Sequence, residues 1–165
     1  MPVTGIIKDA DNRTVTITAE FAAPVERVWQ LYADPRQLER VWGPPTHPAT
    51  FVDHDLTPGG VCRYYMTSPE GEKFGGWWKI ATVEAPHRFT FEDGFADAEL
   101  NPVEGLPVSR NVYSFEAVGE GTRATFVATY DSAEALQQVL DMGMEEGATQ
   151  AINQIDAFLA APVSS

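Results

Sequence analysis

The sequence is poor in cysteine, in lysine and in long apolar runs, and each shortage excludes a class of protein. Cys62 is the single cysteine of 165 residues, so no disulfide can form within the chain, and a reducing, cytoplasmic setting is expected. No apolar run approaches the ~20 residues that a membrane-spanning helix needs, so membrane insertion is not expected. The first residues also lack the basic and then apolar layout of a secretion signal.

Positive charge is scarce along the whole chain. Eleven basic residues, among them the lysines Lys8, Lys73 and Lys79, stand against 24 acidic residues, and the formal net charge is −13. Nucleic-acid binding depends on clustered lysine and arginine that neutralise phosphates, and the few basic residues here are scattered. Nucleic acid is therefore excluded as an expected partner, and we interpret the acidity as a contribution to solubility.

Motifs for metal binding and covalent catalysis are also missing. His47, His54 and His87 are isolated, without a spacing typical of metal ligands, and no second cysteine could assist them. The chain has no nucleophile-elbow pattern and no phosphate-binding loop before a helix. We therefore expect no metal and no cofactor, and enzymatic activity is left open as the less favoured alternative.

What the sequence does contain is a pattern of strands followed by a helix. Hydrophobic residues make up 44% of the chain, and the length suits a single domain over residues 1–165 with a core from about 14 to 159. Period-two alternation and turn residues predict strands, with residues 94–106 as a loop and both ends, 1–4 and 162–165, loose. The predicted strands are 14–21, 49–56, 61–67, 73–84, 87–93, 107–118 and 122–130.

Helical signals appear in two places. Pro24 and the pair Asp34-Pro35 suit the starts of two short helices after the first strand. Near the end of the chain, Asp131 can cap a helix over residues 132–159, which at ~1.5 Å per residue would span roughly 40 Å. Gly143 and Gly147 lie within it, either because the helix contacts the sheet closely or because they give access to a pocket.

Four local motifs resemble those of one protein family. Residues 23–29 (APVERVW) are similar to the opening of the START-like superfamily, also called SRPBCC, which includes the birch-pollen allergen type. Residues 40–45 (RVWGPP), 55–60 (DLTPGG) and 142–147 (MGMEEG) resemble motifs of the branch named after the activator of the ninety-kilodalton heat-shock protein ATPase. Two positions depart from these motifs: Thr57 stands for an arginine and Met144 for a tryptophan.

This resemblance implies an α+β helix-grip fold. A curved seven-stranded antiparallel sheet would wrap around one long C-terminal helix, with two short helices after the first strand. The eukaryotic activator also carries an N-terminal domain for which this chain has no room, so chaperone stimulation is in doubt.

Because one helix cannot fill a strongly bent sheet, we expect a cavity near the middle of the helix. Strand parity nominates the residues of the sheet that would face it, the long helix would contribute three more, and Trp42 would lie near the mouth. Packing of an ordinary core is the simpler interpretation for several of them, such as Phe115 and Phe126. The predicted ligand-binding residues are Trp42, Tyr64, Met66, Trp78, Ile80, Phe89, Phe91, Tyr113, Phe115, Phe126, Met144, Ala148 and Ile152.

The favoured function is non-enzymatic binding or carriage of a small hydrophobic molecule. A second hypothesis is an enzyme similar to polyketide cyclases and aromatases, with Tyr64, Tyr113 and Asp93 as candidate acids and bases. The branch name implies a third, a stress protein with a chaperone partner, and a homodimer is compatible with the sequence. Asp53 and Asp55 share a strand face and could act as paired acids, but a solvated strand edge or an internal salt bridge to Arg63 is the simpler interpretation.

Overall fold

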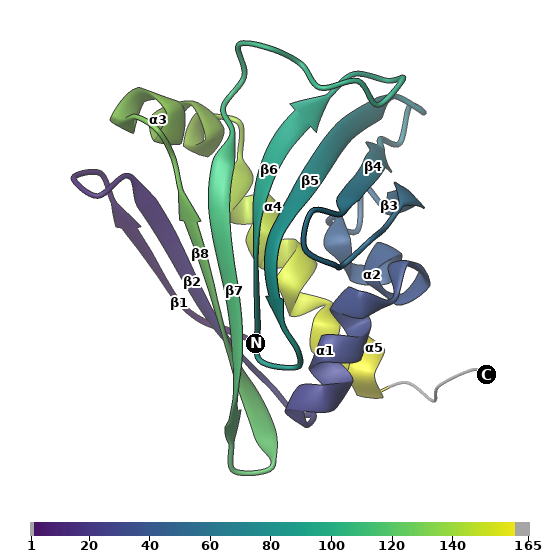
Figure 1. Cartoon of the computed structure of the whole chain (residues 1–165), viewed down its shortest axis with the longest axis vertical. Coiled ribbons are helices and arrows are strands. Elements are labelled where there is room, and N and C mark those ends of the chain that lie inside the picture. Colours follow the sequence, from purple (N-terminus) through teal and green to yellow (C-terminus); the bar gives the residue numbers. More distant parts are fainter. Residues whose placement is uncertain (1, 161–165) are drawn as a thin grey trace.

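The structure, a computed structural model, describes residues 2–160 and shows one curved antiparallel sheet with the helices gathered on one face (Figure 1). The sheet is eight-stranded, in the order β1-β2-β8-β7-β6-β5-β4-β3. Its strands are β1 (Val3–Asp9), β2 (Thr14–Phe21), β3 (Ala49–Asp53), β4 (Val61–Thr67), β5 (Lys73–Glu84), β6 (Arg88–Ala96), β7 (Ser109–Val118) and β8 (Gly121–Thr129).

The prediction of seven strands preceded by a loose N-terminus is wrong, because residues Val3–Asp9 form an additional strand, β1. It pairs antiparallel with β2 through a turn in which the Asn12 amide donates to the Asp9 side chain over 3.1 Å. As an edge strand it has no buried face, so it lacks the apolar alternation by which strands are recognised. The expectation for residues 162–165 lies outside the described residues.

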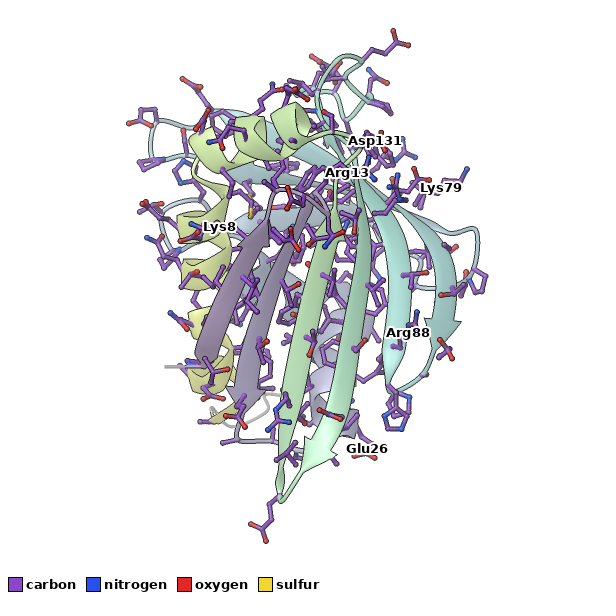
Figure 2. The ribbon with its side chains drawn as sticks, turned by 90° about the vertical axis from the view of Figure 1, so that its left-hand side faces the viewer. Lys8, Arg13, Glu26, Lys79, Arg88 and Asp131 are labelled. Atoms are coloured by element: carbon purple, nitrogen blue, oxygen red, sulfur yellow. The ribbon has the colours of Figure 1, made fainter. Side chains whose placement is uncertain are left out.

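The strand β2 shows why the sheet has one buried face. Val15, Ile17, Ala19 and Phe21 are buried, while the threonines between them are partly exposed. Successive side chains of a strand point to opposite faces, so this alternation fixes which face meets the helices. The opposite face is polar, and Figure 2 shows Lys79 and Arg88 on it, pointing away from the helices.

Two short helices follow β2, as the sequence predicts: α1 (Val25–Ala33) and α2 (Pro35–Trp42). Asp34 caps α2, because its carboxylate accepts the Arg36 amide over 2.9 Å, and Pro35 occupies the first helical position. Together they cover one end of the inner face of the sheet.

The predicted long C-terminal helix is wrong in one respect: the segment is divided into α3 (Ala133–Asp141), α4 (Met144–Asn153) and α5 (Ile155–Ala160). Gly143 separates the first two with φ +88°, a left-handed conformation that ends a right-handed helix. As a result α3 lies at an angle to α4, which runs across the sheet (Figure 1).

The helix cap and the long loop also differ from the prediction. The Ser132 hydroxyl, not Asp131, accepts the Ala135 amide at 3.0 Å, and the Asp131 carboxylate binds Arg110 at 2.8 Å. The expected loop 94–106 begins later, because β6 continues to Ala96. At Gly94 the absence of a side chain makes room for the ring of Trp77 from the neighbouring strand.

Candidate functional site

The inner face of the sheet has a filled end, which lies under α1. Trp29 and Tyr32 of this helix pack against Phe89 and Phe115 of the sheet, with Trp29–Phe89 and Tyr32–Phe115 ring centroids 5.7 and 5.3 Å apart. Phe89 and Phe115 are almost fully buried. Large side chains from both layers therefore pack closely at this end, and Tyr32 forms its border with the cavity described next.

The other end of the inner face is hollow. A cavity of about 620 Å³ lies between the sheet and the helices α2, α3 and α4. Gly147, Ala148 and Ala151 of α4 line it, and a Cβ placed at Gly147 would meet no atom within 4 Å. Neither Gly143 nor Gly147 closely approaches the sheet, which supports the second of the two explanations for these glycines.

Many of the predicted ligand-binding residues lie on the wall of this cavity. They come from α2, β4, β7, β8 and α4, so distant parts of the chain meet here. The lining residues among them are Trp42, Tyr64, Met66, Tyr113, Phe126, Met144, Ala148 and Ile152.

The other predicted residues point inward but do not line the cavity. They belong to the filled end and to an aromatic cluster behind the wall, where the ring centroids of Trp78 and Phe91 lie 4.5 Å apart. Strand parity identified the inner face correctly but could not tell which inward side chains the helices cover. The residues without a place on the cavity wall are Trp78, Ile80, Phe89, Phe91 and Phe115.

Asp93 places a carboxyl group on the cavity wall. It stands on the inner face of β6, opposite Trp78 of β5 and Ser109 of β7. The Tyr64 hydroxyl donates to Asp93 Oδ1 over 3.3 Å. Tyr64 reaches Asp93 from β4 because its ring crosses over Gly76 of the intervening strand, where a Cβ would overlap the ring.

Burial changes the ionisation of this group and its neighbours. Loss of hydration raises the pKa of Asp93 to about 7, an effect that the hydrogen bond from Tyr64 partly offsets. Asp93 is half-buried, and because it lines the cavity its exposed part faces that space. Burial, and then the Asp93 charge, raise the pKa of Tyr64 well above its usual value and that of Tyr130 to about 12. The two tyrosines therefore remain hydrogen-bond donors at neutral pH.

Several polar residues of the site were not predicted. Ser109 and Tyr130 line the cavity near Asp93, and Asn111 is buried beside them with its amide donating to the Ser109 hydroxyl over 3.0 Å. Parity along β7 could have found Ser109 and Asn111, since both lie on the same face as Tyr113. The exposed Phe74 and Met142, with His47, line the cavity where it opens to solvent, and no pattern in the sequence marks them.

The remaining chemistry of the described residues is limited. Within residues 2–160 no group of three or more histidine, cysteine or acidic side chains is arranged to hold a metal ion. Cys62 is buried, and burial raises the pKa of its thiol to about 11. Asp53 forms the expected ion pair with Arg63 at 2.9 Å, but both side chains are about half exposed, so the pair lies at the surface and is not internal. No helix in this part of the chain is both long and apolar enough to cross a membrane.

Comparison with known proteins identifies the family. Residues 22–160 match the family described as "Activator of Hsp90 ATPase homolog 1-like protein". The chain belongs to this family. The resemblance drawn from the four sequence motifs is thus confirmed, and the match covers both short helices, the six strands from β3 to β8 and the C-terminal helices. No protein of curated function matches the chain.

Solved structures share the fold of this chain. A protein from Mycobacterium smegmatis is 65% identical, with a TM-score of 0.91 over 99% of this chain and 100% of that one. A protein from Arthrobacter aurescens is 48% identical, with a TM-score of 0.92 over 98% of this chain and 94% of that one. The AHSA1 protein from Silicibacter pomeroyi, 22% identical with a TM-score of 0.72 over 89% of this chain and 97% of that one, shares the fold.

Proposed function

We propose that this chain binds and carries a small hydrophobic molecule in the cavity between the sheet and α4. The observation that carries the proposal is the cavity itself, whose volume of about 620 Å³ lies within the range of roughly 300–1,000 Å³ typical of small-molecule sites. Its wall is mostly aliphatic and aromatic, and a few polar groups gather around Asp93. This combination suits a ligand with an apolar body and one polar group.

The shape of α4 supports the same proposal. A glycine inside a helix costs about 1 kcal/mol relative to alanine, and Gly147 makes no compensating close contact. Met144, one turn before Ala148 on the lining, is a flexible side chain that can adapt to different guests. Together these residues keep volume free where larger side chains would fill it.

The proposal is tested by filling the cavity. Gly147→Leu and Met144→Trp each add bulk to its wall, and each should lower the affinity for Nile red, a neutral apolar fluorescent probe, by at least about tenfold. Both variants should keep the thermal unfolding temperature within a few degrees of the parent protein. The measurement is a fluorescence titration with the dye.

A matched control is Gly5→Leu, the same chemical change on the exposed edge strand β1, where a Cβ also meets no atom within 4 Å. This variant should bind the dye as the parent does. Equal affinity in all four proteins would show that the dye occupies the surface, and the proposal would fail. Native mass spectrometry of the purified protein then asks whether a copurified molecule is absent from the filled variants.

The environment of Asp93 supports a second candidate, a cyclase-like enzyme. A carboxyl group with a pKa of about 7 can both give and take a proton at neutral pH, and the Tyr64 hydroxyl beside it can donate to a developing oxyanion. In that case Asp93→Asn and Tyr64→Phe would abolish turnover of a cyclisable polyketone while leaving its binding intact.

A further inference from the structure

The charges on the cavity wall are of one sign. Asp93 and Glu146 line the cavity, and no lysine or arginine does so among the described residues. Glu146 is exposed, whereas Asp93 lies farther inside, on the inner face of the sheet. A ligand carboxylate or phosphate would find no lysine or arginine in this cavity and would be repelled by both acids, in a chain whose net charge is already −13.

The hydrogen-bonding capacity of Asp93 is largely unused. An ionised carboxylate can accept about four hydrogen bonds. Asp93 receives one from a side chain of the described protein, the long bond of 3.3 Å from Tyr64. A buried carboxylate with so few donors is costly, and its remaining acceptor sites on the cavity side are open to a donor on a ligand.

Aromatic rings surround the same space. Tyr64, Tyr113 and Trp42 line the cavity, and the Trp42 and Tyr64 ring centroids lie 5.8 Å apart with their planes nearly perpendicular. Aromatic faces attract cations through their quadrupole, and the attraction grows when water is removed. The indole N–H of Trp42 is fully covered, so this side chain offers a ligand its ring rather than a hydrogen-bond donor.

We propose that the molecule held in this cavity is a hydrophobic amine, whose protonated nitrogen pairs with Asp93 between the rings of Tyr64, Tyr113 and Trp42. This inference rests on the proposed cavity-binding function and specifies its ligand class. The apolar body of the amine would extend along Phe126, Met144 and Ile152 toward the cavity mouth. Selectivity for an amine over an acid of the same shape follows from the charge of the wall alone.

The pairing would make binding depend on pH. Asp93 must be ionised to pair with an ammonium group, so affinity should fall by about tenfold per pH unit as pH drops below about 7, where the free protein holds Asp93 protonated. The titratable groups around Asp93 are Tyr64 from β4, Tyr113 from β7 and Tyr130 after β8, with Ser109 of β7 paired opposite Asp93. Glu146 of α4 and His47 line the same cavity. The raised pKa values of the three tyrosines keep them neutral throughout this range.

The test uses three probes of one shape: dodecylamine, dodecanol and dodecanoate, each titrated against the full chain by displacement of Nile red. At about pH 8 the amine should bind at least tenfold more tightly than the acid, with the alcohol between them. Asp93→Asn should remove the advantage of the amine and its dependence on pH while leaving the affinity for the alcohol within about threefold.

The matched control is Glu92→Gln, which removes the same charge from the exposed face one residue away. Glu92→Gln should keep both the preference for the amine and the dependence of amine affinity on pH. If His47 or Glu146 caused that dependence, it would persist in Asp93→Asn. If the parent protein bound the amine and the acid equally, while Gly147→Leu still weakened binding of the alcohol, this inference would be overturned and the proposed cavity function would stand. Binding of none of the three probes would overturn both.

Discussion

The two ends of the inner sheet face share one backbone architecture but differ in the size of the side chains laid over them. Under α1, Trp29 and Tyr32 meet Phe89 and Phe115 and fill the space. Under α4, Gly147 and its small neighbours leave about 620 Å³ open. The hollow is therefore a property of the helix residues, and the curvature of the sheet alone does not produce it.

This difference separates stability from function along a single sheet. Close packing at the filled end gains both hydrophobic burial and dispersion contacts. The hollow end lacks part of this stabilisation, and its wall carries a carboxyl group, that of Asp93, with few hydrogen-bond partners. We therefore expect substitutions at the filled end to change mainly stability, and substitutions at the hollow end to change mainly ligand binding.

The largest effect is expected at the filled end. Phe89→Ala should lower the free energy of unfolding by about 3–5 kcal/mol, because it removes a fully buried ring whose neighbours cannot close the gap. Met144→Ala, a large-to-small change at the hollow end, should cost only about 1 kcal/mol, because that side chain already borders empty space. Urea unfolding of both variants measures the contrast, and equal losses would contradict it.

A somewhat smaller effect is expected from the carboxyl group. The pKa of Asp93 is raised to about 7 from a usual value of 3.8, so the folded state holds a proton that the unfolded state releases. The protein should therefore lose stability as pH rises from about 4 to about 7, and Asp93→Asn should lack this loss. Relative to the parent, the variant should gain roughly 2–4 kcal/mol between pH 4 and 8.

The control for this pH experiment is again Glu92→Gln, which should follow the parent across the whole range because its side chain is solvated. Urea midpoints recorded at half-unit steps of pH supply the measurement. Parallel curves for the parent and Asp93→Asn would show that Asp93 is no harder to ionise in the folded chain than in the unfolded one.

The smallest effect distinguishes the two glycines of the C-terminal helices. Gly147→Ala should stabilise the protein by about 0.5–1 kcal/mol, since the helix gains propensity and the new methyl group meets no atom. Gly143→Ala should destabilise it by about 1 kcal/mol, because φ there is +88°. Thermal unfolding reveals the opposite signs, and a shift of the same sign in both variants would contradict the assigned conformations.

Much of the fold could be predicted from local patterns. The range of β5 was predicted residue for residue, and the cap at Asp34 followed from the pairing of an acceptor side chain with Pro35. These features depend on neighbours in the sequence, as do alternation and turn chemistry. The edge strand β1 could not be predicted, because a strand without a buried face carries no such alternation of apolar and polar residues.

The site was predictable only in part, because a cavity depends on distances between elements. Parity places Tyr64 and Phe89 on one face, but only the packing of the helices decides that α1 covers Phe89 while Tyr64 lines the cavity. The hydrogen bond between Tyr64 and Asp93 depends on Gly76 in the strand between them, a relation that spans three strands. The break at Gly143 required a backbone torsion that glycine permits but does not dictate.

Gly143 also lies where the wall of the cavity meets solvent, since it lines the cavity and is itself exposed. It follows Met142, whose exposed side chain lies at the opening of the cavity, and it connects α3 to α4. Leu136 and Val139 hold α3 in the core, so the change of direction at Gly143 leaves one helix anchored by packing and the next free to line an open space.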